Sequence, residues 1–302
     1  MKWQRGKRSP DLRDQRAGGG GGGIPGRGGG FPIPTGRMGG GGLIGFIIIV
    51  ILFFVLRGGG GGAGFDIPDP TAGFPQAPAS GKGDSVPKGP DPEAEKVDFV
   101  SFVLDDAQGF WEQQFQGAGR PYQRAQLVLF RDAVSSGCGQ ASSATGPFYC
   151  PLDQQVYVDL GFFDELNRRF QAPGDFAQAY VIAHELGHHI QQQLGIEEVR
   201  AKSEESPDDA NELSIRLELQ ADCFAGVWGR STYDRGILEN GDLDEGLTAA
   251  SAVGDDRIQE QAQGRIDPES WTHGSAEQRS HWLQTGFDSG KLEACDTFSG
   301  DV

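Results

Sequence analysis

Hydrophobic and polar positions follow the spacing of a folded domain from residue 93 to the end of the chain. Apolar side chains recur at three- and four-residue intervals from Phe99 to Phe110, which predicts the buried face of a helix. The short apolar or β-branched runs 127–130 and 155–160 predict two strands. Most of the remaining domain is predicted to be helical. The expected helices cover residues 175–194, 207–229, 242–263 and 275–285, and the expected loop between the strands covers residues 135–151.

A different pattern fills the first 92 residues. Residues 43–56 contain no polar side chain, and together with the uncharged glycines before them they are long enough to cross a membrane once as a helix. The chain before this segment is basic and rich in glycine, which is typical of flexible sequence. The chain after it is rich in glycine and proline. The expected parts are a flexible cytoplasmic tail (1–37), a transmembrane anchor (38–57), a linker (58–92) and a folded domain (93–302).

Charge gives the expected orientation and excludes one class of partner. The chain has a net charge of −17 at pH 7, although the tail before the apolar segment is basic. Basic flanks of a membrane segment stay in the cytoplasm, so we expect a single-pass protein of the cell membrane with an extracytoplasmic domain. The basic tail is too long for a cleaved signal peptide. An acidic domain does not attract phosphate backbones, which argues against a nucleic-acid partner.

The helix expected at residues 175–194 carries the sequence HELGH at residues 184–188. Residues i and i+4 lie on the same face of a helix, so His184 and His188 can bind one metal ion. Glu185 lies beside them, where it can reach a water molecule on that ion. This is the H-E-x-x-H arrangement of zinc peptidases.

Catalytic zinc usually has three protein ligands, so a third must come from elsewhere in the chain. The helix expected at 207–229 places Glu218 and Asp222 on one face, among small and apolar residues where an unpaired carboxylate is costly to bury. We expect Glu218 to be the third ligand and Asp222 to accept the N–H of a ligand histidine. The plainer alternative is a solvated helix face. The other histidines that could serve as ligands are His189, which points about 100° away from His188, His273 and His281.

Four cysteines follow the apolar segment, on the side of the membrane where disulfides form. Four cysteines allow three pairings. A Cys138–Cys150 bond would close a short loop. The remaining pair, Cys223 and Cys295, would then join the Glu218 helix to the C-terminal region.

The two metal-helix motifs resemble known peptidases. HELGH at 184–188, followed after about 30 residues by ELQAD at 218–222, is similar to the gluzincin pattern. More closely, the chain resembles the bacterial family of membrane-anchored neutral zinc metallopeptidases over roughly residues 95–295. The segments that carry this resemblance are AHELGHHIQ at 183–191, RLELQADCFAGVW at 216–228, GPFYCP at 146–151, GDD at 254–256 and HGSAEQRS at 273–280.

The resemblance implies a fold, a cofactor and ligands. The fold is α+β: a mainly helical, zincin-like metallopeptidase domain with a small β-sheet, preceded by one transmembrane helix. One Zn²⁺ per chain is expected, with His184, His188 and Glu218 as ligands and Glu185 as the general base.

These observations predict a membrane-anchored, zinc-dependent peptidase that hydrolyses peptide bonds of peptides or proteins in the cell envelope. A zinc-activated water would attack the carbonyl, and Glu185 would take its proton. His273 is expected to stabilise the oxyanion. Arg279 is the second candidate for this role, but a carboxylate such as Asp222 or Asp255 could instead be its partner. Residues 155–160 are expected to form an edge strand that pairs with an extended substrate. The alternatives are an inactive, zinc-stabilised scaffold protein, which would not need Glu185, and a hydrolase of another bond.

Overall fold

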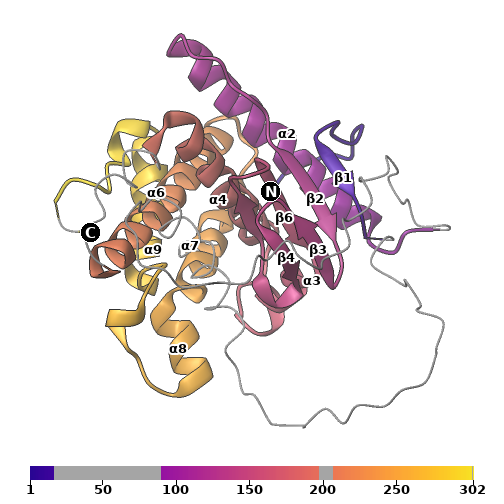
Figure 1. Ribbon diagram of the computed structural model, residues 1–302. Coiled ribbons are helices and arrows are strands. Elements are labelled where there is room, and N and C mark those ends of the chain that lie inside the picture. The colour runs from indigo at the N-terminus through magenta and orange to yellow at the C-terminus, as the bar shows by residue number, and fades with distance from the viewer. Residues whose placement is uncertain (17–89, 197–206, 301) are drawn as a thin grey trace, which may run out of the picture.

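The computed structural model describes residues 1–16, 90–196, 207–300 and 302 (Figure 1). Its helices are α2 (Ala94–Gly117), α3 (Leu160–Arg168), α4 (Asp175–Leu194), α6 (Pro207–Asp234), α7 (Asp242–Ala252), α8 (Asp255–Gln263) and α9 (Ala276–Ser289). Its strands are β1 (Leu12–Asp14), β2 (Gln126–Phe130), β3 (Ala133–Ser136), β4 (Gly139–Ser142), β5 (Phe148–Cys150) and β6 (Gln155–Asp159). Short 3₁₀ turns cover Ser143–Thr145, Pro268–Ser270 and Leu292–Ala294. The expected α+β, mainly helical class is confirmed.

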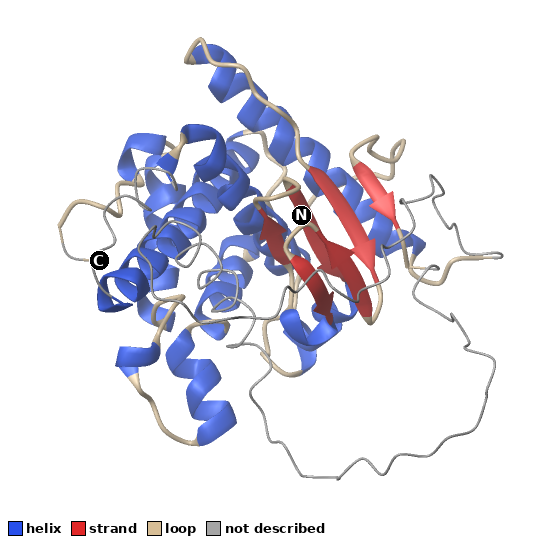
Figure 2. Ribbon diagram, in the orientation of Figure 1, coloured by secondary structure: helices blue, strands red, loops and turns tan. Residues whose placement is uncertain are grey.

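The main sheet has four strands in the order β1-β2-β6-β5. Strands β1, β2 and β6 are parallel, and β5 runs antiparallel to β6. Strands β3 and β4 form a separate antiparallel hairpin. Figure 2 shows the strands grouped on one side of the molecule, with most of the helices on the other. Because β5 is last in the strand order, it forms one edge of the sheet, and it contacts helix α4.

The edge-strand prediction was wrong about which strand forms the edge. Strand β6, which covers the predicted 155–160 segment, lies between β2 and β5 and is buried along nearly its whole length. Strand β2 pairs with β6 along its whole length and β5 pairs with Gln155–Tyr157, so β6 is not the edge to which a substrate strand can add. The predicted loop 135–151 instead contains the β3–β4 hairpin and the edge strand β5. These strands are only three or four residues long and mostly exposed or half-buried, so they lack the buried pattern that marks a strand in sequence.

Residues 1–16 belong to the folded domain, which differs from the flexible tail expected over residues 1–37. Strand β1 pairs with β2, and the guanidinium of Arg16 is buried. Arg16 donates to Asp14 and to Asp91, 2.7 and 2.6 Å away, and lies 3.1 Å from Glu93. Paired strands lie about 4.8 Å apart, whereas the hydrocarbon core of a bilayer is about 30 Å thick. The expectation that the N-terminus and the domain face opposite sides of a membrane therefore does not fit this pairing.

The predicted transmembrane anchor at 38–57 and the linker at 58–92, up to residue 89, lie outside the described residues. Within the part of the chain that the structure describes, no helix combines the length and the apolar character needed to cross a bilayer.

Helix α4 lies at the centre of the domain, where it packs against α2, α6 and α7. The backbones of helices α6 and α9 lie very close together, because each helix has a glycine at the contact. A Cβ atom on Gly286 would lie 2.0 Å from the carbonyl oxygen of Cys223, and one on Gly226 would lie 2.1 Å from that of Leu283. Only a residue without a side chain allows the two backbones to come this close.

Three of the four helices predicted after residue 170 match the structure closely, and the fourth is divided into two helices. Helix α4 has the predicted bounds, from Asp175 to its left-handed end at Gly195. The predicted helix 242–263 is two helices, α7 and α8, with extended backbone at Gly254. A Cβ atom on Gly254 would lie 2.3 Å from the amide nitrogen of Ala276, so the start of α9 occupies the space next to this turn.

Candidate metal centre

Close packing of α4 against α6 brings the two metal-helix motifs together. Gly187 lies between the two motif histidines, and a Cβ atom added to it would lie 3.0 Å from the Cα atom of Ala221. Because both residues are small, the two helix backbones approach within reach of one metal ion. Ala221 in turn lies between Glu218 and Asp222, which places both carboxylates at this contact.

The expected ligands converge. His184 Nε2 lies 3.2 Å from one carboxylate oxygen of Glu218, and His188 Nε2 lies 3.5 Å from the other. Ligand atoms of these three residues all lie within 4.8 Å of one another. The two imidazole rings are 4.9 Å apart and nearly perpendicular, so both can direct a nitrogen at the same point.

Each ligand histidine is held by its other ring nitrogen. His184 Nδ1 lies 2.8 Å from Asp222 Oδ1, and His188 Nδ1 lies 3.0 Å from Gln191 Oε1. Both partners are acceptors at these atoms, so both Nδ1 atoms donate. Each Nε2 atom is then the ring nitrogen that can bind a cation, which is the arrangement of metal-binding histidines. Two imidazole nitrogens and a carboxylate oxygen are a donor set that suits zinc.

The charges of the site favour a cation. Burial by itself lowers the pKa of His184, but Asp222 and Glu218 outweigh it and raise that pKa to about 10. Burial by itself raises the pKa of Glu218, but His188, His273 and His184 outweigh it and hold that pKa well below its usual range. The protein therefore holds positive charge between these carboxylates, either as protons or as a bound cation, and the two compete.

Glu185 lies on α4 beside the ligands and is 8 % exposed. Burial raises the pKa of its carboxyl to about 7, against the charge of His184. The backbone of Tyr149, in the edge strand β5, lies close enough to the Glu185 carboxylate to favour its charged form and lower this pKa. A carboxylate with this pKa exchanges protons readily near neutral pH, as a general base and acid must.

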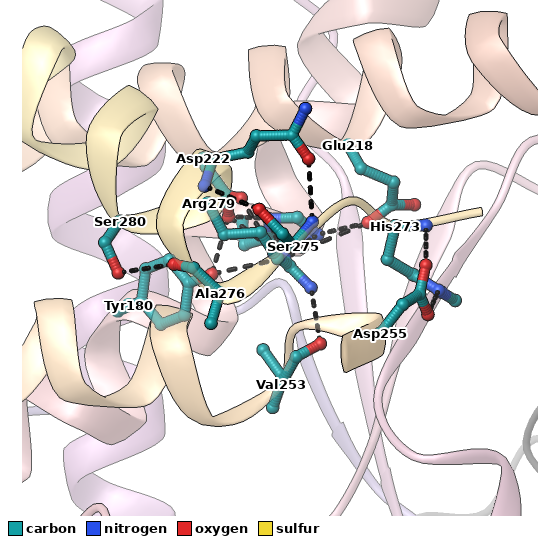
Figure 3. Close-up of polar contacts among 12 residues, drawn as sticks. Tyr180, Glu218, Asp222, Val253, Asp255, His273, Ser275, Ala276, Arg279 and Ser280 are labelled. Carbon is teal, nitrogen blue, oxygen red and sulfur yellow. Dashed lines mark hydrogen bonds and ion pairs between the residues drawn. The ribbon is translucent and has the colours of Figure 1, made fainter. Parts of the chain in front are cut away.

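A buried network surrounds Asp222, as Figure 3 shows. Its two oxygens accept hydrogen bonds from Tyr180 Oη at 2.5 Å, from His184 Nδ1 at 2.8 Å, and from Arg279 Nε and Nη2 at 2.8 and 3.0 Å. Arg279 also donates to the carbonyl of Val253 at 3.3 Å. Arg279 therefore pairs with Asp222, one of the two alternatives that the sequence left open.

His273 lies on the Glu218 side of the site, with Asp255 next to it (Figure 3). Its Nδ1 lies 3.1 Å from Asp255 Oδ1, and its backbone N–H donates to Asp255 Oδ2 at 2.6 Å. Burial lowers the pKa of His273, but Glu218 and Asp255 outweigh it and raise that pKa. The helix that follows starts with a capping box of Ser275 and Gln278, which anchors this segment.

Two contacts that the sequence did not reveal join β5 to α4. Tyr149 Oη bonds to His189 Nδ1 at 3.0 Å and to the side chain of Gln192. His189 Nε2 lies 2.6 Å from the carbonyl of Gln123. The third histidine of the motif therefore fixes the edge strand, and it points away from the metal centre as expected. Only the position of His189 next to His188 hinted at a role.

The cysteines form the disulfides Cys138–Cys150 and Cys223–Cys295. The first ties the β3–β4 turn to the end of β5. The second ties α6 to the segment after α9. Both are the pairs that the short-loop argument favoured.

A centre of two imidazoles and a carboxylate, with a second carboxylate beside it on an H-E-x-x-H helix, is of the type that zinc metallopeptidases use. The protein family to which the chain belongs is consistent with this type of site. The chain belongs to the family described as "putative neutral zinc metallopeptidase", whose model matches residues 1–298. The matched range starts at residue 1 and so includes strand β1.

Two relatives illustrate the similarity to other bacterial proteins. The "uncharacterized protein YpfJ" of Escherichia coli K12 is 44% identical over 305 residues, which cover 100% of both chains. The "uncharacterized protein Rv2575" of Mycobacterium tuberculosis H37Rv is 46% identical over 200 residues, which cover 63% of this chain and 66% of that protein. No solved structure matches the chain.

Proposed function

We propose that this protein is a zinc-dependent peptidase that hydrolyses peptide bonds with Glu185 as the general base. The observation that carries the proposal is the convergence of His184 Nε2, His188 Nε2 and the Glu218 carboxylate, with the buried Glu185 next to them. A purely structural zinc site does not need such a base, and structural sites are usually closed and rich in cysteine. All four cysteines here are in disulfides.

The chemistry that zinc supplies when bound is Lewis acidity toward a peptide carbonyl and toward a water molecule. Glu185 accepts a proton from the attacking water and later delivers it to the leaving amine, while the nearby backbone of Tyr149 favours its charged form. His273, with Asp255 behind it, donates to the carbonyl oxygen as negative charge develops there. Arg279 is committed to Asp222, so it orients His184 through that carboxylate rather than binding substrate.

We also propose that an extended peptide binds along β5. This strand is the sheet edge, and the backbone of its central residue Tyr149 contacts Glu185. A peptide that adds to this edge by main-chain hydrogen bonds would run past the general base. Proline substitution at a β5 position is therefore expected to impair cleavage of peptides more than it impairs zinc binding.

The proposed place of action is the cell envelope, outside the cytoplasm, with residues 1–16 on the same side as the domain because β1 pairs with β2. Two disulfides within the described residues support an oxidising compartment. The test is alkylation of the native protein with and without prior reduction. Four thiols that react without reduction would overturn this location.

The decisive test of the peptidase uses the full-length protein and its Glu185→Gln variant. Wild type is expected to bind one zinc per chain and to cleave members of a mixed peptide library. Glu185→Gln should keep the zinc and lose cleavage by about 10²- to 10⁴-fold. The control is Glu165→Gln, a change at an exposed position on α3. A wild-type chain that binds no zinc, or a Glu185→Gln variant that cleaves as fast as wild type, would overturn the proposal.

A further inference from the structure

A chain of buried amide groups leads from the second imidazole ligand away from the metal centre. Gln191 Oε1 lies 3.0 Å from His188 Nδ1, and Gln191 Nε2 donates to the Leu217 carbonyl at 2.8 Å and to Gln220 Oε1 at 3.1 Å. Gln220 Nε2 donates to the carbonyl of Cys295 at 2.9 Å. We call the two side chains Gln191 and Gln220 the amide relay.

The hydrogen-bond partners of the relay fix the orientation of both amide groups. The carbonyl of Cys295 can only accept, so Gln220 must direct its Nε2 there and its Oε1 toward Gln191. The Nε2 of Gln191 then donates to Gln220 and to Leu217, which leaves Oε1 facing His188. His188 Nδ1 must therefore carry the proton. The Leu217 carbonyl and the far end of the relay thus together decide which nitrogen of His188 is available to a metal ion.

Because both amide side chains are buried, neither water nor a reversed amide can easily replace these hydrogen bonds. Gln191 is 0 % exposed and Gln220 is 6 % exposed, so water cannot readily replace either partner. Reversing one amide would place donors against donors and carbonyls against carbonyls in a region of low dielectric, where unmade hydrogen bonds are costly. The two ligand histidines therefore differ. His184 has the charged Asp222 as its acceptor, whereas His188 depends on a neutral amide that a second amide holds.

A disulfide holds the far end of the relay. Cys223 follows Gln220 by three residues on α6, one helical turn away, and it is bonded to Cys295, the residue whose carbonyl Gln220 contacts. Both cysteines are buried, at 0 % and 1 % exposed. The covalent bond therefore keeps the Cys295 carbonyl against α6.

We propose that Gln191 and Gln220 are positioning residues that orient His188 for metal binding, and that the Cys223–Cys295 disulfide anchors them. The affinity of the site for zinc then depends on a bond that lies outside the ligand set. This inference rests on the metal site of the proposed function and extends it to the groups that set its affinity.

The test measures zinc affinity of the full-length chain by competition with a chelator, and so does not require peptidase activity. Gln191→Met and Gln220→Met keep the side-chain length and remove the hydrogen bonds. Each is expected to weaken zinc binding, Gln191→Met by about 10- to 100-fold. The double variant should bind zinc no more weakly than Gln191→Met alone, because both changes interrupt the same path. The control is Gln178→Met, at the other end of α4, whose amide contacts the carbonyl of Gly174.

The disulfide is tested with two paired variants. Cys223→Ser with Cys295→Ser is expected to weaken zinc binding in the same direction as Gln220→Met. Cys138→Ser with Cys150→Ser removes the other disulfide, which does not touch the relay, and should leave zinc affinity within about twofold of wild type. Equal zinc affinity in the Cys223/Cys295 variant and wild type would overturn the anchoring role.

A second readout separates positioning from a general loss of structure. Nitrogen-15 spectra of the zinc-saturated chain should show His188 bound through Nε2 with its proton on Nδ1 in wild type. In Gln191→Met they should show a mixture of the two ring nitrogens as ligand, with an unchanged circular dichroism spectrum. If Gln191→Met does not fold, Gln220→Met carries the same test, because it leaves Gln191 in place. Wild-type zinc affinity and an unchanged His188 tautomer in a folded relay variant would overturn the inference. A wild-type chain without zinc affinity would instead refute the metal site itself.

Discussion

Replacing Asp222 by asparagine perturbs the one carboxylate that both orients a ligand histidine and neutralises a buried guanidinium. Four donors from Tyr180, His184 and Arg279 reach its two oxygens at 2.5–3.0 Å. Asparagine keeps one oxygen and replaces the other with an NH₂ group, which cannot accept. In either amide orientation at least one donor then faces another donor. Arg279 also loses its counter-charge, and the nearest remaining carboxylate, Glu218, lies 3.9 Å away.

The magnitude follows from burial. Asp222 is 0 % exposed and Arg279 is 4 % exposed, so water cannot solvate the unpaired charge. Breaking such a pair from one side costs about 3–5 kcal/mol. Because Asp222 also accepts the Nδ1–H of His184, we expect zinc affinity to fall by about 10- to 100-fold.

The assay is urea unfolding of the metal-free full-length chain, with Asp222→Asn, Arg279→Met and the double variant. The double variant should be more stable than the sum of the two single changes predicts, because it removes both charges. The control is Asp234→Asn, which breaks the exposed pair with Arg230 on the same helix and should cause no measurable change. A loss below about 1 kcal/mol in Asp222→Asn, or strictly additive effects, would refute the reasoning.

Three further predictions concern packing, the N-terminal segment and pH. Gly286→Ala should destabilise the chain by about 1–3 kcal/mol or more in urea, because its Cβ meets a backbone oxygen of α6, whereas Gly117→Ala, which meets nothing within 4 Å, should not. Arg16→Met should cost about 3 kcal/mol in the same assay and make the first residues accessible to protease; a segment that merely trails from the domain would show neither effect. Because burial raises the pKa of Glu185 from 4.5 to about 7, the folded metal-free chain binds the extra proton within that interval. Its stability should therefore fall as pH rises from 4.5 to 7, and Glu185→Gln should reduce this loss in a pH series of unfolding measurements.

The sequence by itself determined the local part of the metal site. Helical periodicity and the Gly195 end defined α4, and the four-residue spacing of His184 and His188 placed both imidazoles on one face. These features depend only on residues one or two helical turns apart, and the spacing of such residues can be read directly from the sequence. Glu218 and Asp222 were also within reach of sequence, because paired carboxylates among apolar residues need a buried partner.

Only the tertiary structure decided which distant groups meet. The pairing of β1 with β2 joins residues more than a hundred positions apart, and the relay from His188 through Gln191 and Gln220 ends at Cys295. The same holds for the sheet edge, since an apolar run predicts a strand without stating how many neighbours it has. Close approach at small residues, buried hydrogen bonds and strand order arise from contacts between segments, and the spacing of residues within any one segment does not contain them.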